Sequence, residues 1–364
     1  MTDIIRVAPE NPDPAAIARA AECLRNGGLV AFPTETVYGL GVNALDRLAV
    51  QRLFAAKQRP ATDPLIVHVG SFESIAPLVS RVPRNARSLA RRFWPGPLTL
   101  IFPRSARVPD EVTAGLPTVA LRVPSHPVAR ALIEAAGLPV AAPSANLFSR
   151  PSPTQASHVI DDLDGRIDMV VDGGPTTVGV ESTVLDLAGD TPTVLRPGAV
   201  TIEMLRKVVR RVRVVPPSGT RESGSGIRDS RSTDSSMPSP GLLEKHYSPV
   251  AQLTLYEGEN GLVIQSLIEA ALSALAEGKS VGIIAAEEDR ASLAALKSSD
   301  RLFLRVIGSQ DAPDAVASNL YATLRELDAA GANVILVRGF PDHGLWAAVQ
   351  DRLRRAAAGR IVRA

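Results

Sequence analysis

The feature that most constrains the fold of this chain is a change of amino-acid composition at residues 216–240. This stretch reads PPSGTRESGSGIRDSRSTDSSMPSP and contains almost no large apolar side chains. Chain of this composition cannot bury enough apolar surface to pack, which predicts a flexible linker. On both sides of it, short apolar runs alternate with helical patterns. We therefore predict two α/β domains, residues 1–215 and 250–364, joined by a linker segment over residues 216–249.

The first predicted domain holds strand-like runs that are often too close in sequence for a helix between them. The predicted strands are residues 29–32, 65–69, 98–102, 119–123, 169–171, 183–187 and 193–195. The predicted helices are residues 45–57, 85–93, 127–136 and 155–163. Parallel neighbours need a long crossover connection, and several of these gaps are short. We therefore expect a mixed sheet with helices against it.

The second predicted domain alternates more regularly. Its predicted strands are residues 253–255, 281–285, 302–306 and 334–337, and its predicted helices are residues 262–277, 291–297, 315–329 and 345–357. This rhythm is typical of a small parallel α/β domain resembling a Rossmann-type sheet. The glycine-rich turn GxGxxG is missing from the sequence, so no dinucleotide site is predicted there.

The composition is that of a globular protein. Of the 364 residues, 45% are hydrophobic and 21% are charged, and no apolar run approaches the length of a membrane span. Because Cys23 is the single cysteine, an internal disulfide framework and a cysteine-based zinc site are excluded. These features indicate a reduced, cytoplasmic setting. The formal net charge of +2 argues against extended nucleic-acid binding by charge alone.

The sequence PTETVYGLG, at residues 33–41, follows the apolar run at residues 29–32. Two threonines, a carboxylate, a tyrosine and two glycines thus leave the end of a predicted strand together. Small hydroxyl donors and glycines in that place allow an α/β protein to approach a small polar ligand closely. The alternative is an ordinary loop whose hydroxyls make local turn bonds. Similar segments at other predicted strand ends favour the ligand site.

These further segments occur in a fixed order along the chain. They are KQRP at 57–60, PLIVHV at 64–69, WPGPLT at 94–99, TVALRVP at 118–124, APSAN at 142–146, GVEST at 179–183, LRPG at 195–198 and KHYSP at 245–249. In this order and spacing the set resembles the threonylcarbamoyl-AMP synthase family of YrdC-type proteins, in its longer two-domain form. The resemblance implies a YrdC-like twisted mixed sheet with helices, followed by the smaller Rossmann-like domain.

The family resemblance also implies a reaction. L-threonine, bicarbonate and ATP would give threonylcarbamoyl-AMP and pyrophosphate, a nucleotidyl transfer that begins threonylcarbamoyladenosine formation in tRNA. Mg²⁺ would accompany ATP, and no organic cofactor is expected. The implied partners are the downstream tRNA threonylcarbamoyl transferase proteins, with a weak contact to tRNA or double-stranded RNA. One alternative is a non-catalytic RNA-binding module of the same fold. Another is a carbamoyl-transfer module, as in hydrogenase-maturation proteins, but their zinc fingers are excluded here by the single cysteine.

Phosphate binding cannot follow the usual glycine-cradle pattern, because GxxxxGK[ST] is missing from the sequence. Lys57 and Arg59 would instead project to one side of an extended chain and hold the triphosphate as the catalytic cations. The alternative is a solvated Lys/Arg pair at a helix end, favoured by the helix dipole. Asp63, the acidic residue near this pair, is a candidate for contact with ATP or an associated Mg²⁺. No metal ligands are predicted beyond that.

The resemblance assigns the remaining site residues to two groups. For L-threonine these are Thr36, His68, Arg122, Ala142 through its backbone, and Ser182; for ATP they are Arg59, Asp63, Thr118, Ser144, Asn146, Ser152, Arg196 and Tyr247. Arg122 interrupts an apolar strand, so its guanidinium needs an anionic partner, either the substrate carboxylate or an internal Asp or Glu. His68 is either a hydrogen-bonding group at the threonine site or a satisfied core histidine. Tyr247 belongs either to a lid over the pocket or to a plain anchor of the linker.

Overall fold

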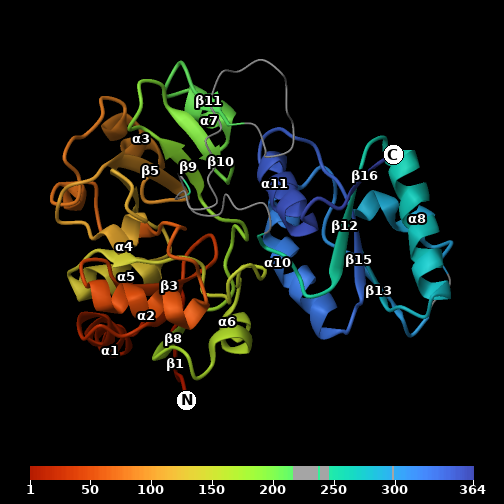
Figure 1. The fold of residues 1–364 in the computed structure, drawn as a ribbon, viewed down its shortest axis with the longest axis horizontal. Coiled ribbons are helices and arrows are strands. Elements are labelled where there is room, and N and C mark those ends of the chain that lie inside the picture. The colour runs from red at the N-terminus through yellow and green to blue at the C-terminus, as the bar shows by residue number, and fades with distance from the viewer. Residues whose placement is uncertain (216–236, 238–245, 297–298) are drawn as a thin grey trace.

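The structure is a computed structural model that describes residues 1–215, 237, 246–296 and 299–364. The predicted linker therefore lies outside the described residues, apart from Met237 and residues 246–249. Figure 1 shows the chain as two α/β bodies side by side, with the first in red to green and the second in cyan to blue. None of the helices in these described ranges is long and apolar enough to cross a membrane.

The first domain is built on a mixed sheet of eleven strands. In chain order they are β1 Asp3–Arg6, β2 Val30–Pro33, β3 Tyr38–Asn43, β4 Ile66–His68, β5 Leu98–Pro103, β6 Thr118–Arg122, β7 Val140–Ala141, β8 Met169–Asp172, β9 Thr183–Asp186, β10 Thr193–Arg196 and β11 Arg213–Val214. Their order in space is β1-β8-β2-β3-β7-β4-β6-β5-β9-β10-β11. Pairs such as β4–β6 are parallel and pairs such as β2–β3 are antiparallel, so the predicted mixed sheet is confirmed.

Helices cover both faces of this sheet. They are α1 Pro14–Arg25, α2 Arg47–Lys57, α3 Ala86–Phe93, α4 Asp110–Thr113, α5 Pro127–Ala136, α6 Ala156–Leu163 and α7 Ile202–Arg206, with a short 3-10 helix at Glu73–Ile75. Leu24 of α1 and Leu132 of α5 share one apolar cluster with Phe32, whereas Leu53 of α2 and Leu89 of α3 belong to another. Burial on both faces explains why the strands read as continuous apolar runs.

The structure contains a strand in this domain that the sequence did not predict. The motif at residues 33–41 is not a loop throughout, because its second half begins strand β3, which pairs antiparallel with β2. Pro33 lies opposite Tyr38 and Val30 lies opposite Gly41. A side chain at position 41 would meet Phe32 at 2.7 Å and Val140 at 2.8 Å, so glycine allows the sheet to close tightly there. Only residues 34–37 turn, and this short turn faces the pocket described below.

The second domain is a smaller sheet of five parallel strands in the order β14-β13-β15-β12-β16. Its elements are β12 Gln252–Glu257, α8 Asn260–Ala276, β13 Val281–Ala285, a 3-10 helix at Glu287–Asp289, α9 Arg290–Leu293, β14 Leu302–Val306, α10 Pro313–Ala329, β15 Val334–Arg338, α11 Trp346–Ala357 and β16 Ile361–Arg363. The predicted parallel α/β domain is confirmed, with one further strand, β16. Figure 1 shows α10 and α11 on the side toward the first domain and α8 on the far side.

Candidate active site

A pocket opens where several strands of the first domain end, and nine of the predicted site residues line it. These are Thr36, Arg59, His68, Arg122, Ala142, Ser144, Ser182, Arg196 and Tyr247. About 540 Å³ of space there is free of protein atoms, part of it open to solvent. The parallel strands β4 and β6 end side by side, so that His68 lies opposite Arg122 in the ladder. Residues far apart in the sequence are thereby brought to one edge of the sheet.

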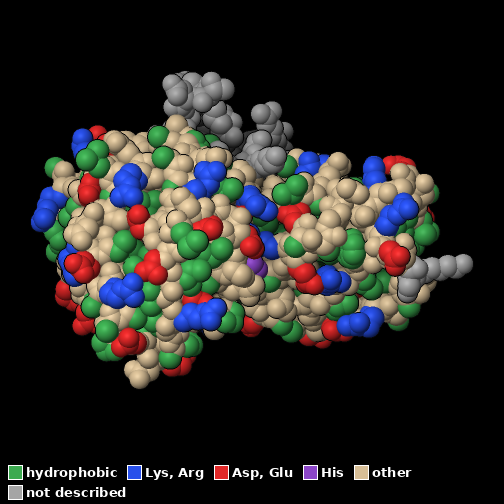
Figure 2. Space-filling view, turned by 90° about the horizontal axis from the view of Figure 1, so that it is seen from below, with side chains coloured by type: hydrophobic (Ala, Val, Ile, Leu, Met, Phe, Trp, Pro, Cys, Tyr) green, Lys and Arg blue, Asp and Glu red, His purple; other side chains and the backbone are tan. Residues whose placement is uncertain are grey.

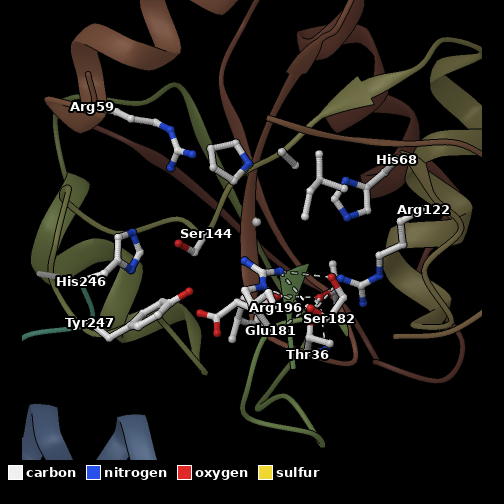
Figure 3. Close-up of a pocket in the computed structure, with 16 residues that line it drawn as sticks. Thr36, Arg59, His68, Arg122, Ser144, Glu181, Ser182, Arg196, His246 and Tyr247 are labelled. Carbon is white, nitrogen blue, oxygen red and sulfur yellow. Dashed lines mark hydrogen bonds between the residues drawn. The ribbon is translucent and has the colours of Figure 1, made fainter. Parts of the chain in front are cut away.

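The pocket has two chemically different ends (Figure 3). His68 and Arg122 lie at one end, and Arg59, His246 and Tyr247 lie at the other, with Ser144 between them. The first end combines a histidine with one arginine, whereas the second combines an arginine with aromatic rings. Such a division suits a ligand pair in which one member is small and polar and the other carries phosphates and a flat base.

The turn at residues 34–37 is held by a chain of hydroxyl groups. Thr34 Oγ1 donates to the carbonyl of Val37 at 2.7 Å, so the 2.8 Å bond between Thr34 and Thr36 has Thr36 as its donor. Arg122 Nη1 in turn donates to Thr36 Oγ1 at 3.1 Å. The turn hydroxyls therefore make local turn bonds, as the second alternative expected, and two of these residues also line the pocket.

Arg122 is paired inside the protein. Its Nη2 lies 2.7 Å from Glu35 Oε1, and its Nε donates to the carbonyl of Gly96 at 3.2 Å. The other oxygen of Glu35 accepts from the amide of Ser125 at 3.1 Å. Burial alone would raise the pKa of Glu35, but Arg122 lowers it below its ordinary value. The internal-carboxylate alternative is therefore what the structure contains, although the guanidinium also lines the pocket.

His68 is neutral in this environment. Burial, and then the positive charge of Arg122, lower its pKa to about 3. Its Nδ1 is buried without a hydrogen-bond partner among the residues that the structure describes. A buried ring nitrogen that lines a pocket in this way is available to a polar ligand.

The expected geometry of Lys57 and Arg59 is wrong. Helix α2 ends at Lys57, and Gln58 has left-handed backbone angles (φ 53°), so the chain does not run extended between the two cations. Lys57 donates its ammonium hydrogens to the carbonyls of Ser144 and Asn146. Burial, together with Arg59, lowers its pKa well below the ordinary value. Lys57 therefore holds the APSAN loop and does not line the pocket, and it is not a solvated helix-end residue either.

Arg59 does line the pocket, and its guanidinium is anchored from behind. It forms an ion pair with Asp63 at 2.9 Å and donates to the carbonyls of Asp63 and Pro64. Asp63 is fully buried and is not among the residues that line the pocket. The structure thus places Asp63 behind Arg59, outside the pocket lining.

Three other predicted nucleotide residues stand outside the pocket. Asn146 donates to the carbonyls of Leu147 and Arg150, which shapes the APSAN loop. Ser152 is fully buried and donates to Glu181 Oε1 at 2.5 Å. Thr118 begins strand β6, at the opposite end from Arg122, and lines a separate small cavity. For these residues the structure indicates supporting positions, with Thr118 remote from the pocket.

Arg196 and Ser182 form one unit on the pocket floor. Arg196 donates through Nε and Nη2 to the carbonyl of Ser182, at 3.2 and 3.0 Å. The hydroxyls of Ser182 and Thr99 share a 2.8 Å hydrogen bond. Strand β10 carries Arg196 and the start of β9 follows Ser182, so antiparallel pairing of these strands brings the two together. The arginine is thereby fixed with part of its positive charge toward the pocket.

Glu181 is the most informative site residue that the sequence reasoning missed. Its carboxylate lines the pocket and accepts hydrogen bonds from Ser152, from Tyr321 at 2.9 Å and from Arg352 at 2.7 Å. Burial alone would raise its pKa, but Arg352 and Arg196 lower it to about 2. Its presence beside Ser182 in the GVEST segment was the available signal. The deciding partners, however, come from the second domain.

Tyr247 forms a wall of the pocket and is strained. It has left-handed backbone angles (φ 59°), which are uncommon outside glycine. Its ring is buried and lies 5.5 Å from the Tyr321 ring, while the His246 ring meets it edge-on at 4.0 Å. The Tyr247 hydroxyl has no hydrogen-bond partner within the described part of the chain. Backbone strain and an unsatisfied buried hydroxyl are features that cluster at ligand sites, which makes Tyr247 a candidate ligand contact.

The pocket provides no ready metal centre. In the described ranges, no cluster of three or more His, Cys, Asp or Glu residues could hold a metal ion. The carboxylates near the pocket are each paired with an arginine: Glu35 with Arg122, Asp63 with Arg59, and Glu181 with Arg352. Mg²⁺ commonly binds through substrate phosphates and water with few protein ligands.

Comparison with known proteins now adds to this geometry. Residues 22–198 match the family model Sua5_yciO_yrdC, described as telomere recombination, and residues 200–358 match Sua5_C, described as the C-terminal domain of threonylcarbamoyl-AMP synthase. The threonylcarbamoyl-AMP synthase of Pyrococcus abyssi is 44% identical over 363 residues, which cover the whole of both chains. The chain belongs to the threonylcarbamoyl-AMP synthase family. The resemblance stated from the motifs is confirmed.

Other relatives agree with this assignment to the threonylcarbamoyl-AMP synthase family. The Bacillus subtilis enzyme of that name is 44% identical over 95% of this chain and 94% of its own. A crystal structure of P. abyssi Sua5 in complex with L-threonine has a TM-score of 0.87 and 42% identity, with full coverage of both chains. A second structure, a double variant of P. abyssi Sua5 with a histidine and a tyrosine each replaced by alanine, has the same TM-score over 98% of its length. Both domains and their arrangement thus have a solved counterpart.

Proposed function

We propose that this chain is an L-threonylcarbamoyladenylate synthase, a nucleotidyltransferase that joins L-threonine, bicarbonate and ATP into threonylcarbamoyl-AMP and releases pyrophosphate. The observation that carries the proposal is that this pocket has two chemically different ends (Figure 3). Relatives that bear the synthase name extend over the whole chain, and a structural relative holds L-threonine. The product would enter threonylcarbamoyladenosine formation in tRNA, and a cytoplasmic location remains a prediction.

In this proposal the threonine end is the one formed by Thr36, His68 and Arg122. The neutral His68 would accept or donate a hydrogen bond without adding charge, and Arg122 would face the amino-acid carboxylate. Because Arg122 already contacts Glu35 at 2.7 Å, it would share its donors between an internal and a substrate carboxylate. A guanidinium has five N–H donors, which makes such sharing feasible. Ala142 and Ser182 complete this part of the lining.

The nucleotide end would be formed by Arg59, Ser144, Arg196 and Tyr247. Arg59 and Arg196 are both fixed by hydrogen bonds to main-chain carbonyls, so their positive charge is already oriented. Preorganised cations of this kind stabilise charge that develops on a transferring phosphoryl group. The ring of Tyr247 offers a surface for the flat base of the adenosine.

The proposed reaction needs no covalent enzyme intermediate. Threonine's amine nitrogen bonds to the carbon of carbon dioxide derived from bicarbonate and loses a proton, which gives a carbamate. A carbamate oxygen then attacks the α-phosphorus of ATP in line, and the bond to the bridging oxygen of the β-phosphate breaks, so that pyrophosphate leaves. Catalysis would come from positioning both substrates in one pocket and from the two arginines. Mg²⁺ would enter on the triphosphate as part of the substrate.

The proposed partners follow from the product and from the surface. The product is a reactive mixed anhydride, so downstream tRNA threonylcarbamoyl transferase proteins must consume it before water does. For RNA itself, Lys/Arg and Asp/Glu side chains are intermingled over the face shown in Figure 2. The exposed residues Arg87, Arg91 and Arg130 line a shallow depression with Trp94, which favours at most a weak, salt-sensitive contact with tRNA or double-stranded RNA. This supports the enzyme over a purely RNA-binding module.

A direct assay tests the proposal. Purified chain is incubated with α-labelled ATP and Mg²⁺, with L-threonine and bicarbonate each present or omitted. We expect pyrophosphate and a threonylcarbamoyl-AMP peak by mass spectrometry only when all components are present. Release of ADP and inorganic phosphate, without pyrophosphate, would contradict it. Filter binding to tRNA at two salt concentrations, with no turnover in the first assay, would instead support the RNA-binding module.

A further inference from the structure

The second domain supplies a buried arginine to the wall of the pocket. Arg352 of α11 is only 1% exposed. Its Nε donates to Glu181 Oε2 at 2.7 Å, and its Nη1 donates to the carbonyl of Pro197 at 3.1 Å. Its guanidinium carbon also lies 5.3 Å from the centre of the Tyr247 ring, within the range of a cation–π contact. One side chain thus touches the GVEST, LRPG and KHYSP segments.

Arg352 itself does not line the pocket, but two of its partners do. Glu181 and Tyr247 both face the cavity, and Figure 3 shows them next to each other. Pro197 directly follows Arg196, another lining residue. Any influence of Arg352 on a bound ligand must therefore pass through these groups. It can act only by fixing where they lie.

A second donor from the same domain reinforces this arrangement. The hydroxyl of Tyr321, on α10, donates to Glu181 Oε2 at 2.9 Å. Asp351 lies 2.7 Å from Arg352 Nη1, so the arginine has a carboxylate on each side. Without Arg352, the buried charge of Glu181 would keep only its hydroxyl donors and the nearby charge of Arg196, and a buried charge that loses its ion-pair partner is costly. The carboxylate would then move, become protonated or admit water.

The backbone just before Glu181 is pressed directly onto α10. A Cβ added to Gly179 would lie 2.3 Å from the Cα of Ser318 and 2.4 Å from the carbonyl oxygen of Ala317. Gly179 also has φ +78°, which side-chain-bearing residues rarely adopt. The amide of Gly179 donates to the carbonyl of Thr36, so this close contact adjoins the turn on the pocket side as well. The two domains therefore meet backbone to backbone beside the pocket.

We infer that Arg352 is a positioning residue for the nucleotide, through which the second domain completes the nucleotide end of the pocket. The inference rests on the proposed function for the identity of that ligand. It assigns the effect to the nucleotide because Glu181 and Tyr247 lie toward Arg59 and Arg196, whereas His68 and Arg122 lie at the other end. The second domain is thus an integral part of the site and not an appended module.

The test compares full-length variants for ATP and for threonine separately. Arg352→Met removes the charge, and Tyr321→Phe removes one donor to Glu181 with almost no change of shape. Arg354→Ala is the matched control, because Arg354 lies on the same helix but pairs with Glu257 and Asp342 within the second domain. Thermal unfolding of each variant checks that it is folded.

We expect Arg352→Met to raise the KM for ATP by about tenfold or more and to leave the KM for threonine within about twofold. Arg352→Lys should restore part of the loss, and Arg354→Ala should change neither value. In a double variant with Glu181→Gln, the two effects on ATP should not multiply, because both act through the same contact. If Arg352→Met does not fold, Tyr321→Phe must show the same selective rise in the KM for ATP.

Any of three results would overturn the inference. Arg352→Met could raise the KM values for ATP and for threonine equally, or Arg354→Ala could raise the KM for ATP as much as Arg352→Met does. The effects of Arg352→Met and Glu181→Gln on ATP could also multiply fully in the double variant. Calorimetric titration with Mg–ATP alone separates it from the proposed function. If the unaltered chain releases no pyrophosphate, the proposed function fails, yet weaker ATP binding by Arg352→Met would still uphold the positioning role. Unchanged ATP binding by that variant would overturn the positioning role alone.

Discussion

Replacing Arg122 with methionine should strongly destabilise the first domain, and replacing its partner at the same time should relieve most of that loss. Arg122 and Glu35 are 2.7 Å apart, with side chains only 4% and 9% exposed. Methionine retains much of the apolar stem but leaves the Glu35 carboxylate buried without a counter-charge. It also removes the donors to the Gly96 carbonyl and the Thr36 hydroxyl. The loss of stability therefore has one large electrostatic contribution and two smaller contributions from lost hydrogen bonds.

The magnitude follows from the two kinds of loss. Breaking a buried ion pair by removing one partner costs about 3–5 kcal/mol. In the double variant Arg122→Met/Glu35→Gln no buried charge remains, and the loss falls to the unsatisfied acceptors, about 1–3 kcal/mol. We therefore expect the double variant to be more stable than Arg122→Met by roughly 2 kcal/mol. Threonine affinity should fall in both variants, because the guanidinium is missing from both.

The chain offers a clean probe for this measurement, because its two tryptophans lie in different domains. Trp94 follows α3 in the first domain and Trp346 begins α11 in the second. In a Trp346→Phe background, the fluorescence of Trp94 during urea unfolding reports the first domain, and calorimetry on the same samples gives threonine affinity. A double variant as unstable as Arg122→Met, or an Arg122→Met loss below about 1 kcal/mol, would refute the reasoning about a buried ion pair.

Three further outcomes are expected. Lys57→Met should destabilise the protein by about 2 kcal/mol or more, because two buried carbonyls lose their donor. It should also raise the KM for ATP, because Lys57 holds the APSAN loop. An unchanged urea unfolding curve would contradict this prediction. Gly179→Ala should weaken the packing of the two domains by at least about 1–2 kcal/mol, which would be measured as faster hydrogen exchange of the α10 amides. Equal α10 exchange rates in the variant and the unaltered chain would contradict the close contact. Because burial lowers the pKa of His68 to about 3, the unfolded chain binds a proton that the folded chain does not, so stability falls as pH drops below about 6.5. His68→Gln should reduce the loss between pH 7 and pH 5 by about 2 kcal/mol, and an unaltered pH dependence would show that His68 is charged.

Strands and helices with long apolar patterns were predictable from the sequence, because burial on both faces dictates their composition. Strands β5 and β6 and helix α5 lie where the apolar runs placed them. Strand β3 was not predicted, because its glycines read as a loop and its pairing with β2 is set by tertiary contacts. The two-residue strand β7 is too short to leave any periodic signal.

Site residues at the ends of strands could be predicted from the sequence. Residues whose side-chain direction depends on the conformation of a turn could not. His68 and Arg122 fall in the same register of parallel strands, which the sequence pattern allows one to expect. The position of Lys57 was predicted wrongly because its spacing to Arg59 suggests an extended chain. In the structure Gln58 ends helix α2 in a left-handed conformation, which a glutamine in the sequence does not indicate. Glu181 gained its importance from Arg352, 171 residues away, and a contact at such separation leaves no local pattern.

The interleaved strand order of the first sheet has a consequence for how the protein is made. β8, at residues 169–172, lies between β1 and β2, so β1 finds its neighbour only after most of the domain has been synthesised. Such distant pairing slows folding, and the second sheet also pairs β12 with the distant strands β15 and β16. Because Arg352 fixes Glu181 and Tyr247, a nascent chain would hold a folded first domain with an incompletely positioned pocket until α11 has emerged. A partly synthesised chain would therefore bind ATP poorly, which limits futile consumption of nucleotide during translation.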